Sequence, residues 1–193
     1  MKKLLLTTII LLAVSSVKAQ CNLPYKSLSE FKNDTTAFML YNFMDRAECY
    51  KGKTLKEVRN DLHLPVKWAM STYNKRRPTI SYGISIGILS NKESIEKIRN
   101  NKHNNTIYIY WEEAYPINPE EDFDAIKNNN LNYYNIYNNC KIKNIYTTIP
   151  EGEKYAKYRK MEEERLKKED EEAKVKKKSL PPLPEEMGWS VKE

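Results

Sequence analysis

The chain has 193 residues, a formal net charge of +7 and a mean hydropathy of −0.77, a size that suffices for one domain with a hydrophobic core and an appendage. It contains only five glycines and two histidines. Glycine-rich catalytic loops and histidine-based metal sites are therefore not expected, because neither His63 nor His103 has a cysteine or carboxylate partner at metal-ligand spacing.

The N-terminus has the three-part pattern of a secretory signal peptide. A cationic start is followed by an apolar run over residues 4–14 and a small-residue exit, so residues 1–19 are expected to be removed between Ala19 and Gln20. The alternative is a membrane anchor, but the run is about half of the ~20 residues that a bilayer span needs. Its three lysines leave +4 on the remaining chain, a weak argument for a nucleic-acid partner, and none is expected.

Cys21 follows the cleavage site, where a bacterial lipoprotein would carry its lipid. Such signals have an apolar residue three positions before the cysteine and a small one just before it, whereas this chain has Lys18 and Gln20. A lipid anchor is therefore not expected. No later segment is apolar enough to cross a membrane, so we expect an exported protein, periplasmic or secreted.

Export exposes cysteines to an oxidising compartment, which favours one disulfide and one remaining thiol. Cys21–Cys49 is the pairing we favour, because it ties the mature N-terminus along the first helix. Pairings that involve Cys140, or three free thiols, stay open.

The clearest structural signal is a strand over residues 79–90, in which five large apolar side chains alternate with small ones. These five are Ile80, Tyr82, Ile84, Ile86 and Ile88. Other strands are predicted over 66–71, 106–113 and 141–149. Ile142 and Tyr146 are expected on one face of the last strand, with Ile145 and Ile149 on the other.

Helices are predicted at 34–48 with an Asp34 N-cap, at 55–63 from the Thr54/Glu57 capping box, at 91–99, and from Asn118 onwards. The fold class is α+β: two N-terminal helices packed on an antiparallel sheet of about four strands, in a domain over 20–149. Phe123 and Ile126 should form the small buried face of their helix, and Arg46 can face water.

From residue 150 the composition changes. Residues 150–193 hold equal numbers of acidic and basic residues, which predicts an exposed charged helix followed by an extended, proline-containing end. This tail either docks on a partner or remains a solvated arm.

Few residues suggest a binding or catalytic site. Tyr108, Tyr110 and Trp111 are candidates for an exposed aromatic strip that binds a glycan or a peptide. Glu112 and Glu113 could serve a glycoside hydrolase, which needs two carboxylates across a cleft. Gly52-Lys53-Thr54 resembles the end of a phosphate-binding loop, but the required first glycine is Ala47 and no strand precedes it.

A short motif suggests a family. Residues 52–58 (Gly52-Lys53-Thr54-Leu55-Lys56-Glu57-Val58), followed by Leu62 and Pro65, resemble a pattern in small exported domains with two helices on an antiparallel sheet. Examples are the small lipoprotein of the outer-membrane barrel-assembly machine and the β-lactamase-inhibitor-protein domains. His63 stands where that pattern has glycine. The resemblance implies a protein-interaction scaffold in the cell envelope.

We therefore expect an exported, non-catalytic protein that binds another envelope or secreted protein through its sheet or its charged arm, without a cofactor or a metal. The alternatives are an envelope module that binds a glycan or peptide through its aromatic side chains and, less favoured, a hydrolase.

Overall fold

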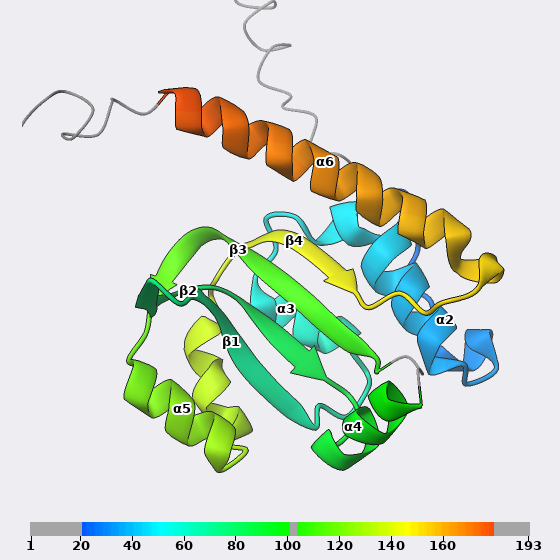
Figure 1. Cartoon of the computed structure of the whole chain (residues 1–193). Helices are drawn as coiled ribbons and strands as arrows, with labels where there is room; N and C mark the ends of the chain where they lie inside the picture. The colour runs from blue at the N-terminus through cyan, green and yellow to red at the C-terminus, as the bar shows by residue number, and fades with distance from the viewer. Residues whose placement is uncertain (1–20, 101–103, 180–193) are drawn as a thin grey trace, which may run out of the picture. The chain divides into compact units, whose positions relative to one another are not determined.

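The computed structural model describes residues 21–100 and 104–179 (Figure 1). The predicted signal peptide, its Ala19/Gln20 cleavage site, His103 and the proline-containing end lie outside the described residues. The chain divides into two compact units, residues 1–148 and 149–193. Each unit is described by itself.

The first unit is built on a four-stranded antiparallel sheet in the order β1-β2-β3-β4. The strands are Trp68–Asn74 (β1), Arg77–Gly87 (β2), Thr106–Pro116 (β3) and Ile142–Thr147 (β4). With the helices described below, this confirms an α+β fold. Every strand pairs with the strand next to it in sequence, so the outer strands are β1 and β4.

The alternating pattern predicted for residues 79–90 holds only in its second half. Ile80 and Tyr82 precede a register shift between Ser81 and Gly83 and are only partly buried, while Ser81 is fully buried. Ile84, Ile86 and Ile88 are buried together with Ile107 and Ile109 of β3. The opposite face of β2 is also covered, since the side chain of Trp68 lies over Gly87 and leaves no room there for a Cβ atom. Small residues on that face are thus required by close packing.

One face assignment in β4 is wrong. Ile142 and Ile145 are both buried, whereas the alternation separates them. The reason is a register shift between Tyr110 and Trp111, after which Trp111 pairs with Ile142. A bulge of this kind adds one residue to a strand and turns the following side chains to the other face.

The first helical region is shorter and more irregular than the predicted 34–48 helix. The helix α2 covers Thr35–Leu40, and the Asp34 side chain accepts a hydrogen bond from the amide of Ala37 at 3.0 Å, as its N-cap role predicts. A π-helical turn (Tyr41–Asp45) and a 3-10 helix (Ala47–Tyr50) follow. These turns bring the rings of Phe43 and Tyr50 into a stacked arrangement, with their centroids 5.8 Å apart, and both side chains are fully buried.

The same irregular turns bury Arg46, which the sequence pattern allowed to face water. Its guanidinium donates to the hydroxyl of Tyr50 at 2.8 Å and to the backbone oxygen of Leu23 at 3.0 Å. It also lies 5.3–5.5 Å from the rings of Tyr50 and Tyr25, within cation–π range. Arg46 therefore holds the N-terminal segment against this region.

The disulfide adds a covalent link at the same place. Cys21 and Cys49 are paired, with their Cα atoms 4.7 Å apart, and Cys140 is a free thiol. This is the pairing that the sequence favours.

Helix α3 (Leu55–Asp61) begins at the predicted capping box. The backbone amide of Thr54 donates to the Glu57 carboxylate at 2.7 Å, and the amide of Glu57 donates back to the Thr54 hydroxyl at 3.4 Å. Leu55 and Val58 then join the hydrophobic core.

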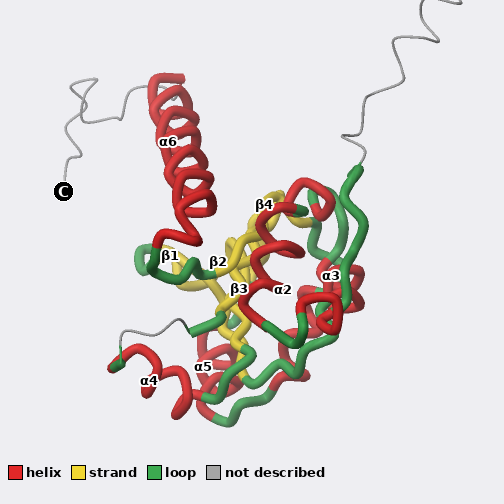
Figure 2. The backbone as a smooth tube through the Cα atoms, turned by 90° about the vertical axis from the view of Figure 1, so that its right-hand side faces the viewer, coloured by secondary structure: helices red, strands yellow, loops and turns green. Residues whose placement is uncertain are grey.

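Three further helical segments lie between the strands: α4 (Asn91–Arg99), α5 (Pro119–Lys127) and a 3-10 helix (Leu131–Tyr137). The predicted bounds of α4 and the Asn118 cap of α5 are confirmed. In both figures, α4 and α5 lie below the label of β1. In Figure 2, α2 and α3 lie to the right of the strands, whereas α4 lies to their left.

The second unit contains α6 (Ala156–Ser179), preceded by a 3-10 turn (Glu153–Tyr155). Within α6, Arg165 forms ion pairs with Glu162 at 2.6 Å and with Glu169 at 2.7 Å. Leu166 and Val175 are exposed. Among the residues described, no helix has both the length and the apolar character needed to cross a lipid bilayer.

Candidate functional site

Tyr108 and Tyr110 alternate with the buried Ile107 and Ile109 of β3, and both are partly exposed. The ring of Tyr146 stacks on Tyr108 at 5.2 Å and on Tyr110 at 5.8 Å. The hydroxyl of Tyr146 donates to that of Tyr110 at 3.2 Å. Partial burial raises the pKa of Tyr108. The three tyrosines form a stacked row across β3 and β4, which we call the tyrosine row.

Trp111, the third candidate of the aromatic strip, is not part of this row. It is buried in the core and its ring contacts Tyr137 at 5.4 Å. Alternation along β3 already places Trp111 on the face of Ile107 and Ile109. Trp111 is therefore a core residue, and the strip is completed by Tyr146, which the sequence analysis did not include.

Glu112 and Glu113 line a pocket of about 430 Å³ together with Tyr115, Cys140 and Lys141. The backbone amide of Glu112 donates to the carbonyl of Lys141 at 2.8 Å, which fixes this end of β3 beside the start of β4. Both glutamates are exposed. Solvent therefore reaches both carboxylates.

Cys140 does not have the surroundings of a nucleophile. Burial raises the pKa of its thiol, which disfavours the reactive thiolate. Its carbonyl accepts from the amide of Leu55, at the start of α3, whereas His63 follows the end of α3 and contacts Tyr25 at 5.5 Å. Across residues 21–100 and 104–179, no group of three or more histidine, cysteine or acidic side chains is arranged to hold a metal ion.

The Gly52-Lys53-Thr54 segment has a structural role. Gly52 has a φ of +75°, a conformation that glycine adopts without strain, and its amide donates to the carbonyl of Ile142 at 2.8 Å. Ile142 in turn donates to the carbonyl of Lys53 at 2.8 Å. The segment thus covers the beginning of the β4 edge before Thr54 caps α3.

Helix α5 packs with a face different from the predicted one. Phe123 is 66% exposed and Ile126 is also exposed, whereas Asp122 is only 2% exposed and Ala125 is buried. The hydroxyl of Ser71 on β1 donates to the Asp122 carboxylate at 2.5 Å. The expectation of a buried Phe123–Ile126 face is therefore wrong, because the helix docks on β1 through a hydrogen bond.

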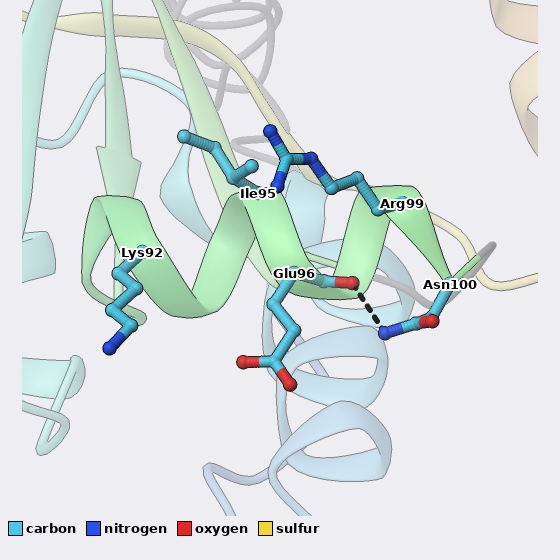
Figure 3. Close-up of a pocket in the computed structure, with 5 residues that line it drawn as sticks. All are labelled: Lys92, Ile95, Glu96, Arg99 and Asn100. Carbon is cyan, nitrogen blue, oxygen red and sulfur yellow. Dashed lines mark hydrogen bonds between the residues drawn. The ribbon is translucent and has the colours of Figure 1, made fainter.

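Helix α4 shows the same arrangement. Ser94 is buried, while Ile95 and Ile98 are exposed, the latter by 57%. Ile95 lines a hollow of about 680 Å³ with four polar residues of the same helix (Figure 3): Lys92, Glu96, Arg99 and Asn100. The amide of Asn100 donates to the backbone oxygen of Glu96 at 2.9 Å. Because α4 and its C-cap residue Asn100 supply all five residues, the hollow does not bring together groups from different elements.

Strand β1 lies between these helices and has two exposed large side chains of its own, Met70 and Tyr73. Asp122 joins α5 to the middle of β1 through Ser71. At the start of α4, hydrogen bonds from Ser90 lower the pKa of Glu93, and the ammonium of Lys67, just before β1, lowers it further. Helix α5 therefore contacts the middle of β1, whereas the start of α4 lies near Lys67, the residue before β1.

Six of the eight exposed large apolar side chains that the structure describes in the first unit belong to these three elements. We call this set the β1 surface: Met70, Tyr73, Ile95, Ile98, Phe123 and Ile126. Sequence reasoning missed it because apolar residues at helical spacing predict a buried face, and the spacing does not say which face is covered.

Comparison of the chain with protein-family models, with curated proteins and with solved structures finds no match.

The buried Asp122 provides a pH-dependent test of the α5 contact. Burial raises its pKa above the ordinary 3.8, so the folded state holds this proton more tightly than the unfolded state. The free energy of unfolding should therefore decrease as pH rises through 3.8 and stop decreasing above the folded-state pKa. Asp122→Asn keeps an acceptor for Ser71 and removes the titration, so the variant should gain stability relative to the parent between pH 4 and pH 8.

Urea denaturation of both proteins at several pH values measures this difference. Asp124→Asn, an exposed change on the same helix, is the control and should follow the parent curve. Parallel curves for Asp122→Asn and the parent would contradict the raised pKa.

Proposed function

We propose that this chain is an exported protein that acts by binding another protein through the β1 surface, without catalysis. The observation that carries the proposal is the gathering of exposed apolar side chains on β1, α4 and α5. Large apolar side chains that remain exposed on a folded domain are typical of protein interaction sites where they form a patch, because water contact with them is unfavourable until a partner covers them.

Two features support the exported location. The sequence begins with a signal-peptide pattern, although that segment lies outside the described residues. The Cys21–Cys49 pair is at disulfide distance, and disulfides persist mainly in oxidising compartments outside the cytosol. A periplasmic or secreted protein would satisfy both.

We further propose that the chain is built like the small exported two-helix domains that its residues 52–65 resemble. In support, residues of both N-terminal helical segments, such as Phe38 and Val58, belong to one core with Ile84 and Ile109 of the sheet. Domains of that kind would give the rigid support that a binding surface needs.

The test is a quantitative purification of tagged protein from the envelope of cells that produce it. A protein that co-purifies with the parent should be reduced at least about tenfold by Phe123→Ser combined with Ile126→Ser, since apolar anchors at an interface each contribute on the order of 1–2 kcal/mol. Both changes replace exposed side chains, so the fold should be retained, as circular dichroism can verify.

The matched control is Leu166→Ser combined with Val175→Ser, which removes two exposed apolar side chains from α6. It should leave the co-purified protein unchanged. If the α6 variant loses the partner and the α5 variant keeps it, binding belongs to the charged arm and our assignment of the surface is wrong.

The tyrosine row favours a second candidate function, binding of a glycan or peptide at Tyr108 and Tyr110. Stacking on Tyr146 already uses ring faces that a sugar would need, which weakens the glycan version. Titration with soluble glycans, followed by tyrosine fluorescence of the parent and of Tyr108→Ala, tests it. A saturable change in the parent that the variant lacks would support this function.

A further inference from the structure

The outward edge of β1 carries a second and separate feature. In the strand order β1-β2-β3-β4, β1 pairs only with β2, and within the described parts of the chain no other segment forms backbone hydrogen bonds with it. The β4 edge differs, since residues 52–54 bond to its beginning. Among the described residues, β1 therefore has a strand partner on one side only.

Exposed edge strands are usually protected by proline, by charged side chains or by coverage, because their free amides and carbonyls can pair with another chain. The residues of β1, Trp68–Asn74, include no proline and no charged side chain. Its register shifts lie at the end, after Thr72. Met70 and Tyr73 of this strand are exposed, and α5, which carries the exposed Phe123, is joined to β1 by the hydrogen bond between Asp122 and Ser71.

The charges at the two ends of β1 indicate the chemistry of the partner. Lys75 and Arg76 form the exposed turn after the strand, Arg77 is the exposed first residue of β2, and Lys67 precedes β1. No ion pair in the described residues involves any of these four side chains. Acidic side chains on an added strand would compensate this positive charge. Their electrostatic attraction would be strongest beside residues 75–77, where three basic residues follow one another.

The same charges argue against a second copy of this chain as the occupant. Two β1 strands paired antiparallel about a two-fold axis would place Lys67 of each copy beside the basic turn of the other. Like charges facing one another at both ends would oppose this dimer.

We propose that β1 accepts an extended peptide segment of the partner protein as a fifth strand, with alternating apolar side chains and an acidic end next to residues 75–77. This inference rests on the proposed binding function and specifies its partner. Main-chain hydrogen bonds along β1 supply affinity, as in other cases of strand addition, while the β1 surface and the basic turn select the sequence.

The experiment uses the protein as purified from the cells that produce it, and a fluorescent nine-residue peptide. The peptide alternates threonine and valine and ends in three acidic residues. Fluorescence anisotropy should show saturable binding that weakens at least tenfold in Arg76→Glu combined with Arg77→Glu. Lys56→Glu combined with Lys143→Glu changes the net charge equally at exposed sites on α3 and β4, and should bind like the parent.

Two further measurements show whether the bound peptide is a strand. Hydrogen exchange should slow at amides of Trp68–Asn74 when the peptide is added, and a peptide with prolines in place of alternate residues should not bind. Protection confined to β3 or β4, equal binding of the proline peptide, or no binding of the acidic peptide would overturn the proposal.

The outcomes separate this inference from the function on which it rests. Suppose that the Phe123→Ser, Ile126→Ser variant loses the co-purified partner and the Arg76→Glu, Arg77→Glu variant retains it. This outcome would support the proposed binding function and refute the addition of a strand with an acidic end. A concentration-dependent dimer in sedimentation that protects the amides of β1 would also refute it, in favour of self-pairing.

Discussion

Gly83→Ala is expected to lower the free energy of unfolding by roughly 3 kcal/mol or more, the upper part of the range for overpacking a close contact. A Cβ atom at this position would lie 2.2 Å from the backbone oxygen of Ile109. Because that oxygen belongs to the neighbouring strand, only a displacement of β3 against β2 could make room. Urea denaturation followed by circular dichroism measures the change.

Two comparisons make the prediction specific. Ser85→Ala, two residues away on the same strand, adds no atom and should cost less than about 1 kcal/mol, since its contact with Thr72 is a long 3.5 Å. Gly87→Ala should lie between them, because the obstacle there is the side chain of Trp68, whose ring can rotate. Equal effects at Gly83 and Ser85 would show that the strands are not in this close contact.

Removal of the disulfide by Cys21→Ser combined with Cys49→Ser is expected to cost about 3–4 kcal/mol. The two cysteines are 28 residues apart, and the loop-entropy relation gives this magnitude for a loop of that length. Arg46 should retain part of the local structure, since it holds the carbonyl of Leu23 independently of the sulfur atoms. The measurement is the urea midpoint of the parent and of the variant under non-reducing conditions.

Cys140→Ser is the control for this second prediction. It removes the free thiol and should change stability by much less than the double substitution. Added reductant should lower the midpoint of the parent and leave that of the double variant unchanged. A parent that is insensitive to reductant, or a large loss in Cys140→Ser, would contradict the Cys21–Cys49 pairing.

Local signals predicted many of the elements well. Asp34, the Thr54/Glu57 box and Asn118 all cap the helices that they were expected to begin. These signals depend on side chains that bond to backbone groups within three residues, so their geometry is complete before any long-range contact forms. The core isoleucines of β2 followed from alternation for a similar reason.

The errors arose where the sequence offers two faces of comparable character. For α5, the apolar pair Phe123 and Ile126 competed with Asp122 and Ala125, and the hydrogen bond between Asp122 and Ser71 decided the orientation. Ser71 is 51 positions away in the sequence, beyond the reach of any periodicity argument. The position of Tyr146 in the tyrosine row likewise depends on residues that are far apart in the sequence, because the pairing of β4 with β3 places Tyr146 opposite Tyr108.

The sequence by itself determined the α+β class, the positions of the strands and helix starts, and the alternation that buries Ile84 and Ile86, because each depends on residues close together in the chain. Only the tertiary structure decided which faces of α4 and α5 are exposed, that β1 is an open edge, and that Arg46 is buried beside the disulfide. Those features depend on the strand order, on register shifts between paired strands and on contacts between distant residues. The spacing of neighbouring residues in the sequence carries no information about the energies of such contacts.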